Sequence, residues 1–179
     1  MATIAGKSNE IAEVNSAAEL NTRAITETAL ERASREGRAF TWDSTEQDID
    51  AGDTMLFVKN TSTTPLRLSR AEINGSNVIC TWTVGVGSAT TTPAGTTVAA
   101  VNMNETFSSK AFGHTALHDE TAVATANTSL RVKTPVTNTV HLDLSGYVLN
   151  EGQYIQITQV TESTSGSVCL VGYFDTVED

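Results

Sequence analysis

The two histidines His114 and His118 are the part of the sequence that comes nearest to a metal site. They stand four residues apart, and two carboxylate residues follow them directly in the segment His114–Glu120. Zinc and iron sites use these ligand types, but they also need a third ligand and a rigid element that holds the set together. The segment lies in the polar stretch 104–127, which we predict to be a loop, and the remaining histidine, His141, is predicted to face outward from a strand. We therefore predict surface residues that bind no metal.

A run of carboxylates that precedes a predicted strand is the second candidate. Hard cations such as calcium prefer oxygen clusters of this kind. A solvated turn, in which Asp side chains accept hydrogen bonds from the nearby backbone, explains the same residues more simply, and we adopt that interpretation. The run consists of Asp43, Glu46, Asp48, Asp50 and Asp53.

No nucleophile motif is present. The sequence has no Gly-x-Ser-x-Gly elbow, no phosphate-binding Gly loop and no Cys–His pairing. Cys80 and Cys169 lie in alternating apolar runs without basic neighbours, so we predict two buried, reduced thiols. A disulfide between them would need neighbouring strands and an oxidising compartment. We expect a protein that is not an enzyme and uses no cofactor.

Composition and charge limit the partners. The chain has 179 residues, of which 39% are hydrophobic, and its net charge is −10. This length predicts one domain with a sizeable core, and the acidic balance predicts no nucleic-acid partner and no membrane partner. No segment approaches the about 20 consecutive apolar residues of a membrane span, and the N-terminus shows no apolar leader. We expect a soluble protein that assembles in a reducing cytoplasm.

The N-terminal part, residues 1–38, is predicted to be a separate piece. It begins as a polar, mostly extended arm that lacks the apolar surface to pack by itself. A capping-box sequence at 28–31 and the later Gly37 predict a short helix over residues 28–36. The piece carries a net charge of −1, whereas residues 39–179 carry −9. We predict that the arm binds a partner through four apolar side chains in separate pockets, namely Ile4, Ile11, Val14 and Leu20.

The sandwich, residues 39–179, is predicted from strand patterns. The apolar run Met55–Val58, bounded by turn residues, predicts a strand that is covered on both faces. Val78, Cys80, Trp82 and Val84 predict one buried face of another strand. Between these two strands lies a third apolar stretch, residues 66–73, in which the alternation of apolar and polar residues slips by one position. This slip predicts a β-bulge near Ser69 and Arg70.

Turns and connections follow from shorter signals. Asn74-Gly75 predicts a hairpin turn, residues 85–95 predict a loop, and Thr97–Met103 predicts a further strand. Two similar corner phrases, at 49–57 and 149–157, predict two sheets that face each other. With eight to ten short strands and no helix–strand alternation, the expected fold is all β. We predict a two-sheet β-sandwich of jelly-roll type with a mostly extended N-terminal arm and a short helix.

A series of turn-and-strand phrases then resembles small virion structural proteins of tailed bacteriophages, of the capsid decoration, collar or tail type. The phrases, in order, are Arg23-Ala24-Ile25, Glu36–Phe40, Asp50–Thr54 with Lys59–Ser62, Thr96–Asn104 and Gly172–Asp175. The resemblance implies a β-sandwich that assembles on the virion as a homo-oligomer, with a trimer favoured. It implies partners such as the major capsid, portal or tail proteins, and it implies no catalytic residues.

A carbohydrate-binding module for host attachment is the alternative. Carbohydrate binding by a sandwich needs exposed aromatic side chains or a calcium site. Aromatic residues make up only 6% of the chain, and both Trp42 and Trp82 lie on predicted strands. The virion protein is therefore the preferred prediction.

Overall fold

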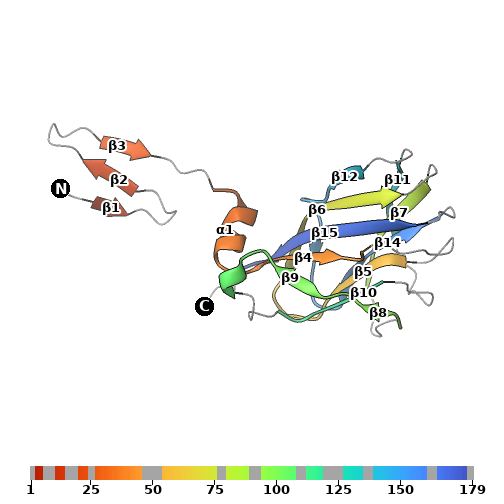
Figure 1. Ribbon diagram of the computed structural model, residues 1–179. Helices are drawn as coiled ribbons and strands as arrows, with labels where there is room; N and C mark the ends of the chain where they lie inside the picture. The colour runs from red at the N-terminus through yellow and green to blue at the C-terminus, as the bar shows by residue number, and fades with distance from the viewer. Residues whose placement is uncertain are drawn as a thin grey trace.

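Two antiparallel β-sheets that pack face to face form the body of the protein, as the computed structural model shows (Figure 1). The fold is mostly β, as predicted, with a sandwich-like arrangement. The structure describes residues 3–5, 11–14, 20–23, 27–45, 54–75, 80–88, 94–107, 112–118, 127–134, 139–160 and 165–176.

The first sheet has the strand order β11-β7-β14-β5-β10-β8, and all its pairs are antiparallel. In that order the strands are β11 (Asn127–Thr134), β7 (Cys80–Ser88), β14 (Gln153–Gln159), β5 (Thr54–Asn60), β10 (His114–His118) and β8 (Thr96–Thr97). The second sheet has the order β12-β6-β15-β4-β9, with β13 also beside β6. Its strands are β12 (Thr139–Asp143), β6 (Leu66–Gly75), β15 (Gly166–Phe174), β4 (Ala39–Asp43), β9 (Ala100–Asn102) and β13 (Val148–Leu149).

Four nested pairs organise both sheets. β4 pairs with β15, β5 with β14, β6 with β12 and β7 with β11. Each pair is therefore enclosed in the sequence by the pair before it, with β4 and β15 outermost and β7 and β11 innermost. Along the chain β4, β5, β6 and β7 alternate between the two sheets. The segment between β7 and β11 supplies β8, β9 and β10, which extend both sheets on the same side as β5 and β4.

The core lies between the sheets, and β5 is its most buried strand. All seven residues of β5 are buried, which confirms the predicted two-sided burial of Met55–Val58. Leu56 and Val58 face the main core, whereas Phe57 packs on the outer face against Tyr154, with 4.9 Å between the ring centroids. Met55 also joins the main core because the pairing with β14 skips it, which places a bulge there.

The predicted bulge in β6 is confirmed. Val171 pairs with Arg70 and Gly172 pairs with Leu68, so Ser69 is the extra residue. The bulge lets Leu66 and Leu68 share the core with Ala71 and Ile73 despite the slip in the sequence alternation. The peptide oxygen of Ser69 accepts a hydrogen bond from the amide of Leu144 at 2.9 Å, so the inserted peptide is satisfied.

The predicted hairpin turn at Asn74-Gly75 is wrong. Both residues belong to β6, and Gly75 pairs with Gly166 of β15. A Cβ at Gly166 would come within 2.9 Å of the Trp82 ring, so this pairing depends on glycine and lets the indole approach the backbone. The glycine that this close packing needs is therefore Gly166 of β15, and Gly75 beside it stays in the strand.

Three other predictions about connections are also wrong. β5 and β14, which follow the two similar corner phrases, are neighbours in one sheet and do not belong to facing sheets. β7 continues through residues 85–88, which were assigned to a loop. The predicted strand 97–103 divides into β8 and β9, which lie in different sheets. Val98 makes the crossing, because it is buried and its amide donates to the oxygen of Ala116 at 2.9 Å.

Helix α1 (Ala29–Arg35) confirms the predicted helix and its capping box. The Thr28 hydroxyl accepts from the amide of Glu31 at 3.2 Å, and the Glu31 carboxylate accepts from the amide of Thr28 at 2.7 Å. At the other end Gly37 adopts φ +70°, and the amides of Gly37 and Arg38 donate back to the last turn. This is a Schellman termination, which directs the chain straight into β4.

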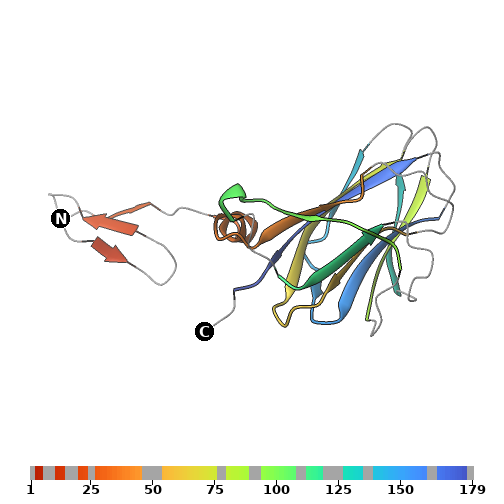
Figure 2. The ribbon, with the colours of Figure 1, turned by 60° about the horizontal axis from the view of Figure 1, so that its bottom comes forward.

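The N-terminal arm contains three short paired strands that the sequence analysis did not predict. They are β1 (Thr3–Ala5), β2 (Ile11–Val14) and β3 (Leu20–Arg23), in the antiparallel order β1-β2-β3. Figures 1 and 2 show this small sheet beyond α1, on the side opposite to the sandwich. The arm is thus extended, as predicted, but its extended segments pair with one another.

Candidate interaction surface

One stretch of the chain lacks charged residues altogether. Residues 73–104 contain no Asp, Glu, Lys or Arg, although 18% of the whole chain is charged. The last part of this stretch builds β8 and β9, which close the side of the molecule. Figure 2 shows β9 running from the 3₁₀ turn η1 (Glu105–Phe107), beside α1, along the sandwich. We call the segment 100–107 the β9 edge.

The β9 edge exposes large apolar side chains. Val101 is 62% exposed, Met103 39% and Phe107 38%. Within the described ranges only Val148 and Val160 are comparably exposed; Val148 lies on β13 and Val160 directly follows β14. Register explains the exposure of Val101, because it pairs with Thr41 while its neighbour Ala100 pairs with Trp42 and packs against the core. Val101 and Met103 stand two residues apart, and exposed apolar side chains that gather on a sheet edge are of the kind that marks contact sites.

The backbone of β9 is available for pairing on its outer side. β9 ends its sheet, and only β4 pairs with it among the described residues. The amide of Met103 donates a hydrogen bond to the oxygen of Ala39 at 2.9 Å. Because the backbone of a strand alternates its direction, Met103 and Val101 are the residues whose backbone groups point toward β4. Ala100 and Asn102 therefore direct their backbone groups away from the sheet. Such an edge is a template for pairing with another chain.

The other edges are protected differently. β11 carries Arg131 and Lys133 in its sequence, and β12 carries the exposed residues His141 and Asp143. Charged residues on an edge strand discourage pairing with other chains. β8 is only two residues long. Strand β9, which carries no charged residue, is thus the least protected edge strand of the sandwich in the described part of the chain.

Side-chain amides hold the β9 edge in place. Asn102 donates to the oxygens of Gly37 and Phe107 at 2.9 and 3.1 Å, and Asn104 donates to the oxygen of Arg35 at 3.2 Å. These bonds join η1 to the C-terminal end of α1. Phe107 lies directly over Gly37, where a Cβ would come within 2.4 Å of the phenylalanine Cβ. The apolar surface is therefore pre-formed and tied to the helix that leads to the arm.

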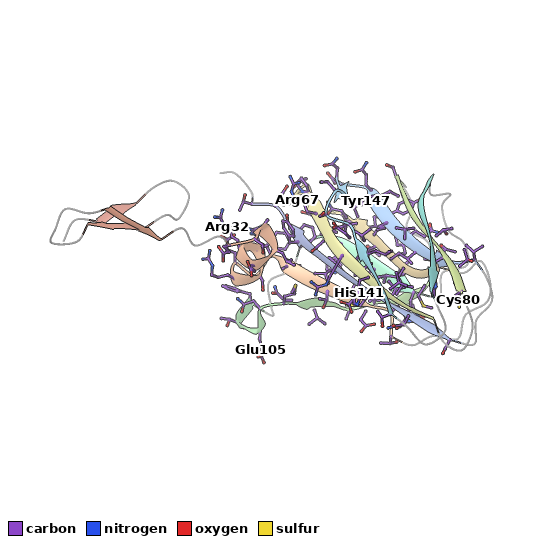
Figure 3. All side chains as sticks on the ribbon, turned by 90° about the horizontal axis from the view of Figure 1, so that it is seen from above. Arg32, Arg67, Cys80, Glu105, His141 and Tyr147 are labelled. Atoms are coloured by element: carbon purple, nitrogen blue, oxygen red, sulfur yellow. The ribbon has the colours of Figure 1, made fainter. Side chains whose placement is uncertain are left out.

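Arg38 fixes α1 to the sandwich. Its side chain is only 10% exposed and donates to the carbonyl oxygen of Phe174 and to the Glu36 carboxylate. On the outer side of α1, Glu27 accepts from Arg35 at 2.9 Å, and this contact lowers the pKa of Glu27. Arg32, labelled with Glu105 in Figure 3, lines a depression of about 300 Å³ between α1 and the end of β15. The base of the arm thus has a defined position beside the β9 edge.

The prediction that His114 and His118 lie in a loop is wrong, because they begin and end strand β10. Four residues of strand span about 13 Å, so the two residues are too far apart to chelate one ion. The His114 ring packs edge-on against Trp42 at 5.7 Å, and its Nδ1 lies 2.8 Å from the oxygen of Phe112. Nδ1 of His118 is buried without a hydrogen bond in the described residues. Nowhere in those residues do three His, Cys, Asp or Glu side chains gather as a metal site would need.

The carboxylate run is only partly described. Asp43 is exposed and accepts from the amide of Thr45 at 2.8 Å, as a turn aspartate does. The remaining members, Glu46, Asp48, Asp50 and Asp53, lie outside the described residues. The one residue that can be judged therefore agrees with a solvated turn.

The two cysteines differ in burial, and neither belongs to a disulfide. Cys80 is fully buried in the core, as predicted. Cys169 is only partly buried, because it faces away from its buried neighbours Val168 and Leu170. Burial raises the pKa of the Cys169 thiol, and the nearby carboxylates of Asp43 and Glu72 raise it further. The prediction of two buried thiols is therefore wrong for Cys169, whose environment disfavours a reactive thiolate.

The aromatic residues bear on the carbohydrate alternative. Trp42 and Trp82 are fully buried, so neither offers a stacking platform. A depression of about 620 Å³ at the ends of β7 and β14 is lined by Tyr147 and Gln153, among others. Tyr147 is partly buried and packs against the core. The depression therefore offers one aromatic side chain, Tyr147.

Comparison of the chain with protein-family models, with curated proteins and with solved structures found no match. No helix in the described residues has the length and apolar character of a membrane span. The predicted partner-binding residues of the arm lie on β1, β2 and β3, and they are Ile4, Ile11, Val14 and Leu20. That they bind a partner stays a prediction. No sequence motif marks the β9 edge, and the missing charge over residues 73–104 points to it only once β9 is known to be an edge strand.

Proposed function

We propose that the protein is a non-enzymatic structural component of a bacteriophage virion, of the capsid cement, decoration, collar or tail kind. It assembles as a homo-oligomer, with a trimer favoured, and attaches through its N-terminal arm to a neighbouring subunit or to a major capsid, portal or tail protein. The observation that carries the proposal is the exposed apolar β9 edge, whose strand carries no charged residue, on an otherwise acidic sandwich. A chain that acts alone leaves such an edge open to unwanted pairing, whereas a building block has it covered.

The topology supports a jelly-roll fold within this proposal. The four nested pairs are those of a long antiparallel hairpin that is rolled up, so that its strands alternate between two sheets. Jelly rolls occur in viral capsid and lectin domains and in cupins. Fold alone does not decide between these uses, so the choice rests on the β9 edge and on the resemblance to virion proteins.

Particle incorporation tests the proposal. Phage particles that lack this protein would be supplied with the wild-type chain, with a chain that lacks residues 2–26, or with Val101→Glu, and bound copies would be counted by quantitative mass spectrometry. The deletion stops before Glu27 because α1 and Arg38 are part of the folded body. Val160→Glu is the matched control, since Val160 is 42% exposed and lies away from the β9 edge.

We expect wild-type occupancy for Val160→Glu and loss of occupancy for the other two variants. Absence of the protein from purified particles would overturn the proposal. Calcium-dependent binding on a glycan array, weakened by Tyr147→Ala and unaccompanied by particle incorporation, would favour the carbohydrate-binding alternative instead.

A further inference from the structure

The depression between α1 and the end of β15 gathers hydrogen-bond donors from three segments. It has a volume of about 300 Å³, and α1 packs against both β15 and β4 at this end of the sandwich (Figure 1). Arg32 comes from α1, and Arg38 comes from the turn that leads into β4. Tyr173 lies near the end of β15, and Thr176 follows that strand. Two guanidinium groups and two hydroxyl groups therefore surround one recess.

Arg38 keeps donors for a ligand although it is already bonded. Its side chain is only 10% exposed, so its charge is held nine-tenths buried at the wall of the depression. A guanidinium has five N–H groups, and Arg38 uses three of them, one for the oxygen of Phe174 and two for the Glu36 carboxylate. One N–H group on each terminal nitrogen makes no hydrogen bond within the described residues. A fixed, buried cation with two remaining donors is suited to bind an anion.

Arg32 is the less engaged of the two arginines. Its Nε lies 3.7 Å from Oε2 of Glu27, which is beyond hydrogen-bond distance. Glu27 instead accepts two hydrogen bonds from Arg35, at 3.0 and 2.9 Å. The Arg32 side chain is 46% exposed and lines the depression, so its donors can turn to a ligand there.

The charges around the depression leave a positive excess. Arg35 neutralises Glu27, which also lines the depression. Arg38 neutralises Glu36, so the charge of Arg32 is left over. The remaining carboxylate of α1 accepts hydrogen bonds at the N-terminal cap and is not part of the lining. Because the whole chain carries −10, this local excess comes from placement and not from composition.

A phosphate group fits these donors better than a carboxylate does. A carboxylate is planar, and the fork of a single arginine satisfies it. Phosphate presents oxygens in several directions, so two guanidinium groups on separate segments can each bind it. The hydroxyl of Tyr173 makes no hydrogen bond within the described residues, and together with the Thr176 hydroxyl it can donate to a further oxygen. The volume also leaves room for the group that carries a phosphate ester.

We propose that this depression binds one phosphate group, free or as a monoester, between Arg32 and Arg38. The hydroxyls of Tyr173 and Thr176 donate to the same group. The bound phosphate joins α1 to the sandwich at the base of the arm. This site goes beyond the proposed virion role and does not depend on it.

Calorimetric titration of the full-length protein with inorganic phosphate, in a chloride buffer of low ionic strength at neutral pH, tests the proposal. We expect one site in the wild type. Arg32→Ala should weaken binding by about tenfold or more, because it removes a charged donor. Arg70→Ala is the matched control, since Arg70 is 49% exposed, pairs with Glu72 and lies on β6 outside the depression. It removes the same charge and should leave phosphate binding unchanged.

Glu27→Gln should have the opposite effect. It removes the carboxylate that lines the depression and should tighten phosphate binding by roughly fivefold. A damaged fold could only weaken binding, so a gain cannot come from misfolding. An unchanged urea midpoint shows that Arg32→Ala is folded.

Two further ligands complete the experiment. Glycerol 3-phosphate that binds at least as tightly as inorganic phosphate would support the site and indicate a phosphate ester, whereas binding of inorganic phosphate alone would support it and indicate the free ion. Acetate should bind more weakly than either. The proposal is overturned if phosphate does not bind, if acetate binds as tightly, if Arg32→Ala and Arg70→Ala weaken binding equally, or if Glu27→Gln gives no gain. Because no particle is involved, such a failure leaves the incorporation test of the proposed function standing.

Discussion

Gly37→Ala tests whether the β9 edge is held firmly against α1. Gly37 has φ +70°, and a Cβ added there would lie 2.4 Å from Cβ, 2.5 Å from Cγ and 2.8 Å from Cδ2 of Phe107. Contacts below 3.0 Å force something to move. The movable part is η1, which Asn102 and Asn104 tie to the end of the helix.

The expected cost has two parts. The left-handed backbone conformation costs a non-glycine residue about 1–2 kcal/mol. Displacing Phe107 and the hydrogen-bonded turn below it adds about 1–3 kcal/mol, as overpacking does elsewhere. We therefore expect Gly37→Ala to lower the free energy of unfolding by about 2–5 kcal/mol.

Gly152→Ala is the matched control. Gly152 has φ +79°, but a Cβ there would meet nothing within 4 Å, so only the backbone part of about 1–2 kcal/mol applies. Urea unfolding followed by the fluorescence of the buried Trp42 and Trp82 measures both variants. In a Phe107→Gly background the extra cost of Gly37→Ala should disappear, since the clash is then removed. Equal costs at positions 37 and 152 in the wild-type background would refute the reasoning, because η1 would then move aside freely.

Three further outcomes are expected. The backbone and hydroxyl hydrogen bonds from Thr28 lower the pKa of Glu31 below its ordinary value of 4.5. The stabilisation that these bonds give is therefore complete above pH 4.5 and is lost as the pH falls through the pKa of the folded state. The protection factors of the α1 amides, which correct for the intrinsic pH dependence of hydrogen exchange, should fall in that acid range, and Glu31→Gln should remove this fall. In native protein a thiol reagent should label only Cys169, slowly and more readily at high pH because its pKa is raised, and denaturant should release Cys80; labelling of Cys80 first would contradict the burial. Calorimetric titration with zinc should give no stoichiometric binding that depends on His114 and His118, since a strand separates them.

Local structure was predicted well where neighbouring residues decide it. The capping box needs only Thr28 and Glu31 at the right spacing, and both hydrogen bonds form. The bulge at Ser69 followed from the hydrophobic alternation, because a strand with one buried face cannot tolerate a slip of one residue. The burial of β5 on both faces followed from its unbroken apolar run.

Predictions failed where distant parts of the chain decide the outcome. β10 has no apolar alternation of its own, and it is a strand because β5 on one side and β8 on the other supply its hydrogen bonds. Asn74-Gly75 has the local chemistry of a turn, but pairing with β15 keeps it extended. The assignment of β8 and β9 to different sheets depends on the burial of Val98 between them, which no local pattern encodes.

The candidate site belongs to the second group, and this explains why sequence motifs did not reveal it. An absence of charge over residues 73–104 is ambiguous by itself, because core strands such as β7 lack charge for a different reason. It becomes informative only when β9 is known to be an edge strand, where natural sheets usually place charges against unwanted pairing. At that position an uncharged strand with the exposed residues Val101 and Met103 costs a lone molecule solubility. The same residues would stabilise the assembly that we propose, in which another chain covers them, so the missing charge at this edge agrees with that proposal.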